Sequence, residues 1–266
     1  MGKIIAVANQ KGGVGKSTTV VNLAAYLGSR GNKVLCIDTD AQGNATTGFG
    51  IKKKGVTAAY DVLLGKAKIE DAVIVTEFKN VSVIPGTADL AGAEVELIKM
   101  EDKFRRLKAA ILPIKDDYDF ILIDCPPALG MLTLNSLTAA DEVLIPMLAE
   151  YYALEGLTQL VHTLRLVRSN YNPGLQICGI VFTMYDNRLN VSRQVVEEVQ
   201  KYFPDKIFQT KIPRNVRLSE APSYGKPIMY YDKNSKGALY YELLGKEVLG
   251  EEFDSITKWR MRKGLI

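Results

Sequence analysis

Short apolar runs alternate with stretches of helical periodicity along most of the chain. Several of these runs are continuously apolar rather than alternating, which is typical of strands buried on both faces of a parallel sheet. The pattern therefore predicts an α/β fold, in which a mostly parallel, twisted sheet lies between two layers of helices. The expected strands cover residues 3–8, 33–38, 81–85, 119–124, 142–146, 176–183 and 206–210.

The first expected helix begins directly after a glycine-rich loop and spans residues 16–30. Gly31 follows it, a residue suited to the left-handed conformation that ends many helices. No internal repeat, low-complexity stretch or Pro/Ser-rich linker interrupts the chain. Its 266 residues, 47% of them hydrophobic, fit a single domain over 1–266. The apolar face of this helix consists of Val20, Leu23, Ala24 and Leu27.

Composition narrows the class of protein without choosing a function. The first residues lack a signal-peptide pattern, and no apolar stretch approaches the roughly 20 residues that cross a bilayer, so a soluble, cytoplasmic protein is expected. The 34 basic and 30 acidic residues give a charge of +4, too small to indicate nucleic-acid binding by itself. Cys36, Cys125 and Cys178 lie far apart and are expected to be reduced core residues rather than zinc ligands or disulfides.

The strongest candidate for chemistry is the loop Lys11-Gly12-Gly13-Val14-Gly15-Lys16-Ser17-Thr18. In a strand–loop–helix unit, backbone N–H groups and the helix N-terminus surround an anion. Lys16 would place a positive charge at the β- and γ-phosphates, and Ser17 is positioned to bind Mg²⁺. Gln10 stands where the strict phosphate-loop pattern has its first glycine, so Gly12 and Gly13 are expected to supply the backbone freedom. The loop predicts a site for ATP and Mg²⁺.

Three carboxylates follow expected strands. Asp38 and Asp40 lie at the end of the second strand and Asp124 ends the fourth. Ligands of open α/β sheets bind at the carboxyl ends of the strands, so these side chains are expected near the phosphate loop. Asp124 is expected to hold Mg²⁺ through water. The only histidine, His162, lies in an amphipathic helical pattern and is interpreted as structural.

With these motifs the chain resembles the deviant Walker A ATPases, and within them the ParA/Soj proteins that partition chromosomes and plasmids. The resemblance covers nearly the whole chain and implies a three-layer P-loop NTPase fold. In that family the residue matching Lys11 reaches across a dimer interface to the partner's ATP, which implies an ATP-sandwich homodimer. Two lysines on one triphosphate would also reduce the repulsion between two nucleotide-loaded faces. The matching segments are KGGVGKST, DTDAQGNAT, DFILIDCPP, AEYYALEG and IPRNVRLSEAPSYGKP.

The resemblance also implies roles for individual residues. Asp40 would orient the attacking water, while Asp38 would support the metal and the adjoining switch loop. Family members usually have proline where Ala41 stands, which leaves Asp40 untouched. The base of the nucleotide is expected near Asn187 and the turn that contains Pro213 and Asn215. No dedicated strong base is evident, so a slow, partner-stimulated ATPase is expected, with Lys11, Lys16, Asp40 and Asp124 as its catalytic residues.

Basic residues cluster in the carboxyl-terminal half of the chain, where loop arginines can contact phosphates without reading sequence. The resemblance implies that Arg188 and Arg217 belong to a non-specific double-stranded DNA surface, with Arg214 and Lys211 beside them. It further implies a ParB-type centromere-binding partner that stimulates hydrolysis, and a nucleoid-associated location.

Other functions on the same fold remain as alternatives. A MinD-like, membrane-associated division-site ATPase shares the loop and Lys11, and only the tail at residues 251–266 favours it. That tail combines Phe253, Ile256 and Trp259 with basic residues, although a final helix docked on the core is the preferred interpretation. A small-molecule ligase would need a substrate pocket that the sequence does not reveal. An electron-transfer relative would need a second cluster-bridging cysteine besides Cys125.

Overall fold

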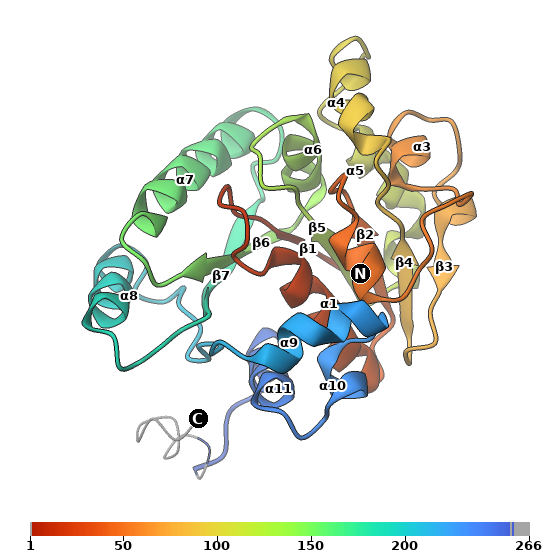
Figure 1. The fold of residues 1–266 in the computed structure, drawn as a ribbon. Coiled ribbons are helices and arrows are strands. Elements are labelled where there is room, and N and C mark those ends of the chain that lie inside the picture. The colour runs from red at the N-terminus through yellow and green to blue at the C-terminus, as the bar shows by residue number, and fades with distance from the viewer. Residues whose placement is uncertain (1, 256, 258–266) are drawn as a thin grey trace.

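The computed structural model describes residues 2–255 and 257, and its centre is a seven-stranded sheet (Figure 1). The strand order is β3-β4-β2-β5-β1-β6-β7, and all neighbouring strands are parallel except the antiparallel pair β3 and β4. The strands are β1 (Lys3–Val7), β2 (Val34–Asp38), β3 (Ile74–Val75), β4 (Val81–Ile84), β5 (Phe120–Asp124), β6 (Glu142–Leu148) and β7 (Gln176–Thr183).

Helices cover both faces of the sheet (Figure 1). The α-helices are α1 (Lys16–Ser29), α2 (Asn44–Gly48), α3 (Ala59–Leu63), α4 (Leu90–Ile98), α5 (Arg106–Ile111), α6 (Met131–Ala139), α7 (Ala153–Asn170), α8 (Asn190–Tyr202), α9 (Val216–Glu220), α10 (Ile228–Tyr231) and α11 (Lys236–Val248). Short 3₁₀ turns are η1 (Glu70–Ala72), η2 (Leu112–Asp117) and η3 (Ala221–Tyr224).

The core divides into two layers because alternate strand residues point to opposite faces of the sheet. In β1, Ile4 and Ala6 pack with the buried residues of α3 to α8, whereas Ile5 and Val7 pack with those of α1, α2, α10 and α11. The central strands are therefore apolar on both sides, as their continuous runs predicted. The predicted three-layer α/β fold is confirmed.

Helix α1 matches its predicted span and face. Leu23, Ala24 and Leu27 are fully buried in the second core layer, together with Val20. Gly31 lies just beyond the helix with φ of 99°, the left-handed conformation expected there.

One predicted strand is wrong. Residues 206–210 form only an isolated bridge, in which Ile207 pairs with Ile180 of β7. The backbone N–H groups of Gln209 and Thr210 instead donate to the carboxylate of Glu247 on α11, at 2.7 and 2.9 Å. The side chain of another element thus takes two of the segment's donors, while the N–H of Phe208 still donates to the carbonyl of Ile180 at 3.0 Å. The sheet also gains the two-residue strand β3, which the apolar pattern did not predict.

The sheet topology determines where a ligand can bind. Strands β2, β5 and β1 are neighbours, and Asp38, Asp124 and Val7 lie in register at their carboxyl ends. The loop between β1 and α1 leaves the sheet at this same edge (Figure 1).

At the carboxyl-terminal end, Phe253 is buried. Residues 251–254 are not helical, whereas Ile256 and residues 258–266, with Trp259 among them, lie outside the described residues. The single-domain assignment over 1–266 stays a prediction. Within the described part of the chain, no helix has both the length and the apolar character to span a membrane.

Candidate nucleotide-binding site

The loop between β1 and α1 presents free backbone donors to a ligand. Gly13 and Gly15 have φ of 73° and 85°, which favours glycine at both positions. Gly12 is not among the residues in this left-handed region, so the required freedom lies one and three residues later. Gly15 caps α1 without any side-chain hydrogen bond, and no acidic residue lies in the first helical turn. The N-terminus of α1 is therefore available to an anion.

Lys16 is almost buried beneath this loop, with 7% of its surface exposed. Its Nζ donates to the carbonyl of Lys11 at 3.2 Å. Burial lowers the pKa of Lys16, and the negative charge of Asp124 partly opposes that shift. A buried ammonium group with one carbonyl partner suits a ligand that brings negative charge.

Lys11 lies differently. Its side chain is about one-third exposed, and its Nζ forms an ion pair with Glu150 at 2.7 Å. Glu150 lies between β6 and α7, so this lysine contacts the neighbouring connection rather than the interior of its own loop.

Asp124 is a buried carboxylate without a conventional partner. Both its oxygens are buried and accept no hydrogen bond from the described residues. Burial raises the pKa of Asp124 well above its usual range, and the charge of Asp38 raises it further, while the nearby Ser17 hydroxyl acts in the opposite direction. The arrangement leaves two carboxylate oxygens able to bind a cation.

Asp38 is also buried, but its oxygens are occupied. One oxygen accepts from the backbone N–H and the hydroxyl of Thr46, at 2.8 and 2.7 Å, and the other accepts from the N–H of Asp40 at 3.1 Å. Burial raises the pKa of Asp38 to about 6, and these hydrogen bonds limit the shift. Asp38 thus connects the end of β2 to α2.

The oxygens of this site fit Mg²⁺, which favours oxygen ligands and usually keeps several waters and phosphate oxygens. The unpartnered oxygens of Asp124, with Ser17 beside them, supply the suitable donor set. No group of three or more His, Cys, Asp or Glu side chains able to hold a metal occurs within residues 2–255 and 257. Mg²⁺ would therefore be bound together with the nucleotide rather than in a protein cage.

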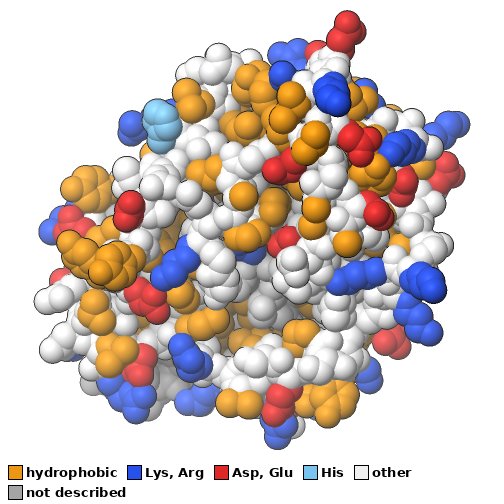
Figure 2. Space-filling model, turned by 45° about the horizontal axis from the view of Figure 1, so that its top comes forward, with side chains coloured by type: hydrophobic (Ala, Val, Ile, Leu, Met, Phe, Trp, Pro, Cys, Tyr) orange, Lys and Arg blue, Asp and Glu red, His pale blue; other side chains and the backbone are white. Residues whose placement is uncertain are grey.

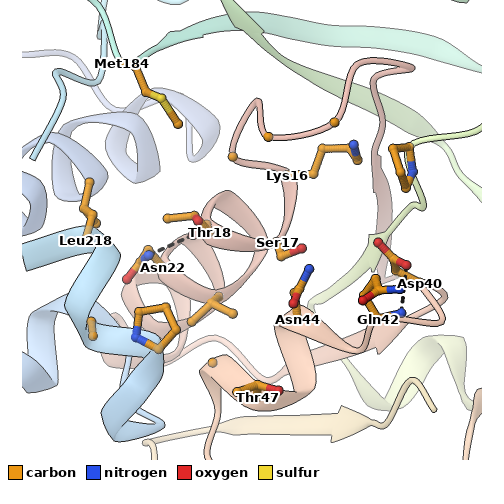
Figure 3. Close-up of a pocket in the computed structure, with 18 of the residues that line it drawn as sticks. Lys16, Ser17, Thr18, Asn22, Asp40, Gln42, Asn44, Thr47, Met184 and Leu218 are labelled. Atoms are coloured by element: carbon orange, nitrogen blue, oxygen red, sulfur yellow. Dashed lines mark hydrogen bonds between the residues drawn. The ribbon is translucent and has the colours of Figure 1, made fainter. Parts of the chain in front are cut away.

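A cavity of about 380 Å³ extends from the phosphate loop and is shown in Figure 3. Lys16, Ser17 and Asp40 line one end of it, whereas Met184 and Leu218 lie at the opposite end. Asp40 is nearly buried, and one of its carboxylate oxygens accepts from the N–H of Gln42 at 3.0 Å. The cavity therefore has a charged end and a more apolar end, as a nucleoside triphosphate does. Its wall also includes Gly12, Gly13, Gly15, Thr18, Asn22, Asn44, Thr47, Pro127, Ala221 and Pro222, and the Val14 side chain is buried outside the lining.

Sequence reasoning expected a different far wall. Asn187 and Pro213 line a second cavity of about 890 Å³, and Asn215 caps α9 by accepting from Leu218 N–H at 3.3 Å. Met184 instead faces the first cavity, with φ of 50°, an unusual value for a residue other than glycine. Nothing in the local sequence indicated this position of Met184. Leu218 lies within the family-like segment IPRNVRLSEAPSYGKP, but the spacing of that segment does not show its orientation.

The predicted basic residues gather around the second cavity. Arg188, Lys211 and Arg214 line it, and Arg217 lies nearby on α9. Arg188 is strongly exposed and forms a two-pronged ion pair with Asp186, at 2.9 and 2.6 Å. Figure 2 shows that lysine and arginine side chains on the viewed face are scattered among apolar and acidic ones rather than joined in one block.

Arg217 is held by two carboxylates. Its guanidinium lies 2.8 Å from Glu220 and 3.5 Å from Asp232. Lys211 is less accessible, and burial lowers its pKa. His162 is exposed on α7 and takes no part in either cavity, while Cys36 and Cys125 are buried free thiols and Cys178 is a half-buried one.

Known proteins share this fold and loop. A family model described as an AAA domain matches residues 2–177. The sporulation initiation inhibitor protein Soj of Bacillus subtilis is 56% identical over 249 residues, which cover 93% of this chain and 98% of Soj. The chromosome partitioning protein ParA of Myxococcus xanthus is 52% identical over 250 residues, covering 94% and 88%.

A solved structure agrees with these relatives in fold. Cobyrinic acid a,c-diamide synthase from Mycobacterium smegmatis, crystallised with ADP and magnesium, is 35% identical with a TM-score of 0.82, covering 94% of each chain. Its bound ADP and magnesium support nucleotide and Mg²⁺ binding in proteins of this fold. The higher identity to the partitioning proteins favours that assignment over a ligase or a MinD-like ATPase. The chain belongs to the ParA/Soj family of chromosome-partitioning ATPases.

Proposed function

We propose that the chain is a nucleotide-switched ATPase of DNA segregation. ATP joins two copies, the dimer binds double-stranded DNA without sequence preference, and a ParB-type centromere-binding partner stimulates hydrolysis and release. The observation that carries the proposal is the second lysine of the ATP loop, Lys11, which lies beside the phosphate site without entering it. The protein would then be associated with the nucleoid.

The hydrolysis step requires few residues. Lys16 and the loop N–H groups would hold the phosphates, and Ser17 and Asp124 would hold the Mg²⁺, whose chemistry is to neutralise phosphate charge. Asp40 lines the cavity and would orient the attacking water molecule. A carboxylate that orients water without a stronger base is consistent with slow turnover, which a partner would accelerate.

Dimer formation would use the face that contains the loop. In a single copy, Lys11 pairs with Glu150, and large apolar side chains are exposed close by in sequence, including Tyr151 and Tyr152 at 72% and 77%. Met184 and Leu189 are also exposed and line the second cavity. A second copy would cover apolar surface and offer Lys11 a triphosphate in place of Glu150.

DNA binding would use exposed guanidinium groups. Arg188 lies on the loop before α8, and Arg217 lies on the short helix α9. From these positions both can contact the phosphates of the DNA backbone. Each is partly neutralised by carboxylates of the same chain, so a single copy is expected to bind DNA weakly. Two copies present twice the number of contacts, and affinity rises steeply with that number.

A charge reversal tests the surface. Arg217→Glu should weaken binding of the ATP-loaded protein to a random-sequence duplex by at least about tenfold in low salt. The matched control is Lys66→Glu, just after α3, whose buried residues pack on the opposite face of the sheet from Leu218 of α9, and it should leave binding unchanged. Fluorescence anisotropy of labelled duplex measures both. Equal affinities of Arg217→Glu and the wild type would remove Arg217 from the proposed surface.

A further inference from the structure

Two buried polar side chains tie the phosphate loop to the carboxyl ends of β6 and β7. Thr183, the last residue of β7, has its hydroxyl 2.8 Å from the carbonyl oxygen of Val14 and 3.3 Å from that of Met147. Asn9 donates from Nδ2 to the carbonyl of Pro146 at 2.7 Å, and its Oδ1 accepts from the N–H of Lys11 at 3.0 Å. Both side chains are almost completely buried, so water cannot readily take the place of these hydrogen bonds, and losing one of them costs free energy.

Thr183 holds the middle of the loop. Its hydroxyl has one proton, and the shorter distance assigns that proton to Val14. Val14 lies between Gly13 and Gly15, whose backbones are in the left-handed region. Glycines lose more conformational freedom on ordering than other residues, so a loop built on them needs an external restraint to keep one shape.

Asn9 holds the beginning of the loop. The peptide that it restrains is that of Lys11, whose carbonyl oxygen accepts from Lys16 Nζ at 3.2 Å. Asn9 thus holds Lys11, the residue whose carbonyl oxygen accepts from the buried Lys16. It also lies at the base of Lys11, whose side chain turns towards Glu150.

We infer that Thr183 and Asn9 are positioning residues for ATP binding, which hold the phosphate loop in its ligand-binding shape before the nucleotide arrives. Neither lines the nucleotide cavity, although Thr183 lines the second cavity, and both act through loop peptides. A loop ordered in advance spends less binding energy on its own ordering. The loop amides contact phosphate before and during hydrolysis, so loss of either restraint raises KM more than it lowers kcat.

The test compares isosteric variants at Thr183. Thr183→Val keeps the shape and loses the hydroxyl, and it raises the Kd for ADP and the KM for ATP by about tenfold. Thr183→Ser restores the hydroxyl and returns both values to within about twofold of the wild type. In the proposed switch only ATP joins two copies, so ADP affinity, measured by isothermal titration calorimetry, does not depend on dimerisation or on DNA.

The matched control lies in the β3–β4 turn, where Thr76 donates to the carbonyl of Val81 at 2.7 Å. Thr76→Val lowers the free energy of unfolding without changing the Kd for ADP. Asn9→Ala supplies a second arm should Thr183→Val fail to fold. Its control is Asn172→Ala. Asn172 is also a buried asparagine, and its Nδ2 donates to the carbonyls of Leu137 and Ala140.

Three results would overturn the inference. The first is wild-type ADP affinity in folded Thr183→Val or Asn9→Ala, and the second is equal weakening in Thr183→Ser and Thr183→Val. The third is a fall in kcat at unchanged KM. Because the readout is nucleotide affinity of a single copy, these results are separate from any failure of DNA binding.

Discussion

At the scale of single residues, the buried charges of the nucleotide site lower the stability of the fold until its ligands bind. Asp124 is fully buried without a hydrogen-bond partner among the described residues, and Asp38 is buried close to it. Lys16 is buried above them with one carbonyl partner. Mg²⁺ and a triphosphate would compensate these charges, so ligand binding and folding stability are expected to be strongly linked.

Asp124→Asn is expected to stabilise the ligand-free protein while removing its response to Mg²⁺. The substitution deletes a poorly solvated charge and keeps the shape of the side chain. Its Tm without nucleotide should exceed that of the wild type by a few degrees at pH 7. The further rise in Tm on adding Mg²⁺ and ATP should be much smaller than in the wild type. A lower Tm than the wild type in the absence of ligand would contradict this account of Asp124.

The same carboxyls predict a pH dependence. The folded pKa of Asp38 is about 6, above the roughly 3.9 of an unfolded aspartate, and the pKa of Asp124 is also raised. Such groups contribute stability below the unfolded pKa, and that contribution is lost as the pH rises through the folded pKa. The stability advantage of Asp124→Asn should therefore be absent near pH 4 and grow as the pH rises. Denaturant unfolding at several pH values, without nucleotide, measures the difference.

The two loop lysines should fail in different ways. Lys16→Ala removes the buried charge at the phosphates and should abolish ATP binding. Lys11→Ala removes only a partly exposed ion pair, which contributes about 0–1 kcal/mol, so ATP binding and Tm should stay close to wild type. Its predicted loss is ATP-dependent dimerisation, which light scattering after size exclusion measures. Normal dimers of Lys11→Ala with ATP would contradict the role proposed for this residue.

Among the helices, two segments that are far apart in sequence close the nucleotide cavity. The first is α2 and the second is α9 with η3. Helix α2 begins shortly after Asp40. In α9, Leu218 lines the cavity, whereas Arg217 pairs with Glu220 outside it. The segments meet at Gly50 and Gly225, both with positive φ. The nucleotide cavity and the proposed DNA surface thus share one wall.

Gly225→Ala tests that meeting point. A Cβ at Gly225 would lie 2.5 Å from the Cα of Gly50, so the two segments must separate. Gly55 is the control because it has a similar φ of 71° but open space around it. Each substitution costs about 1–2 kcal/mol of backbone strain, and Gly225→Ala should cost more in Tm and also weaken ATP binding. Equal effects of Gly225→Ala and Gly55→Ala would show that the contact is unimportant.

The sequence predicted the parts of this site that lie on regular elements. Apolar runs identified the parallel strands, and strand ends then placed Asp38 and Asp124 beside the phosphate loop. The far wall was not predictable, because Met184 and Leu218 reach it through tertiary packing and an unusual φ rather than through any local pattern. The false strand at residues 206–210 has the same origin, since Glu247, on a helix far along the chain, accepts from two of its backbone N–H groups.

At the scale of the whole molecule, the ATP site, the second lysine and the basic surface together form the proposed switch. The basic surface is not dense, and Arg188 and Arg217 are paired with acids, so binding should depend on the number of contacts that a dimer brings together. The logarithm of the DNA affinity should fall linearly with the logarithm of the salt concentration. Arg217→Glu should reduce that slope, whereas Lys66→Glu should not.

The central claim is that nucleotide state controls DNA binding. The most direct measurement is the affinity of the wild-type chain for one random-sequence duplex with Mg²⁺ and ATP, with Mg²⁺ and ADP, and without nucleotide, at a single salt concentration. Tight binding is expected only with ATP, together with the mass of a dimer in that state. Equal DNA affinity in the three states would contradict it.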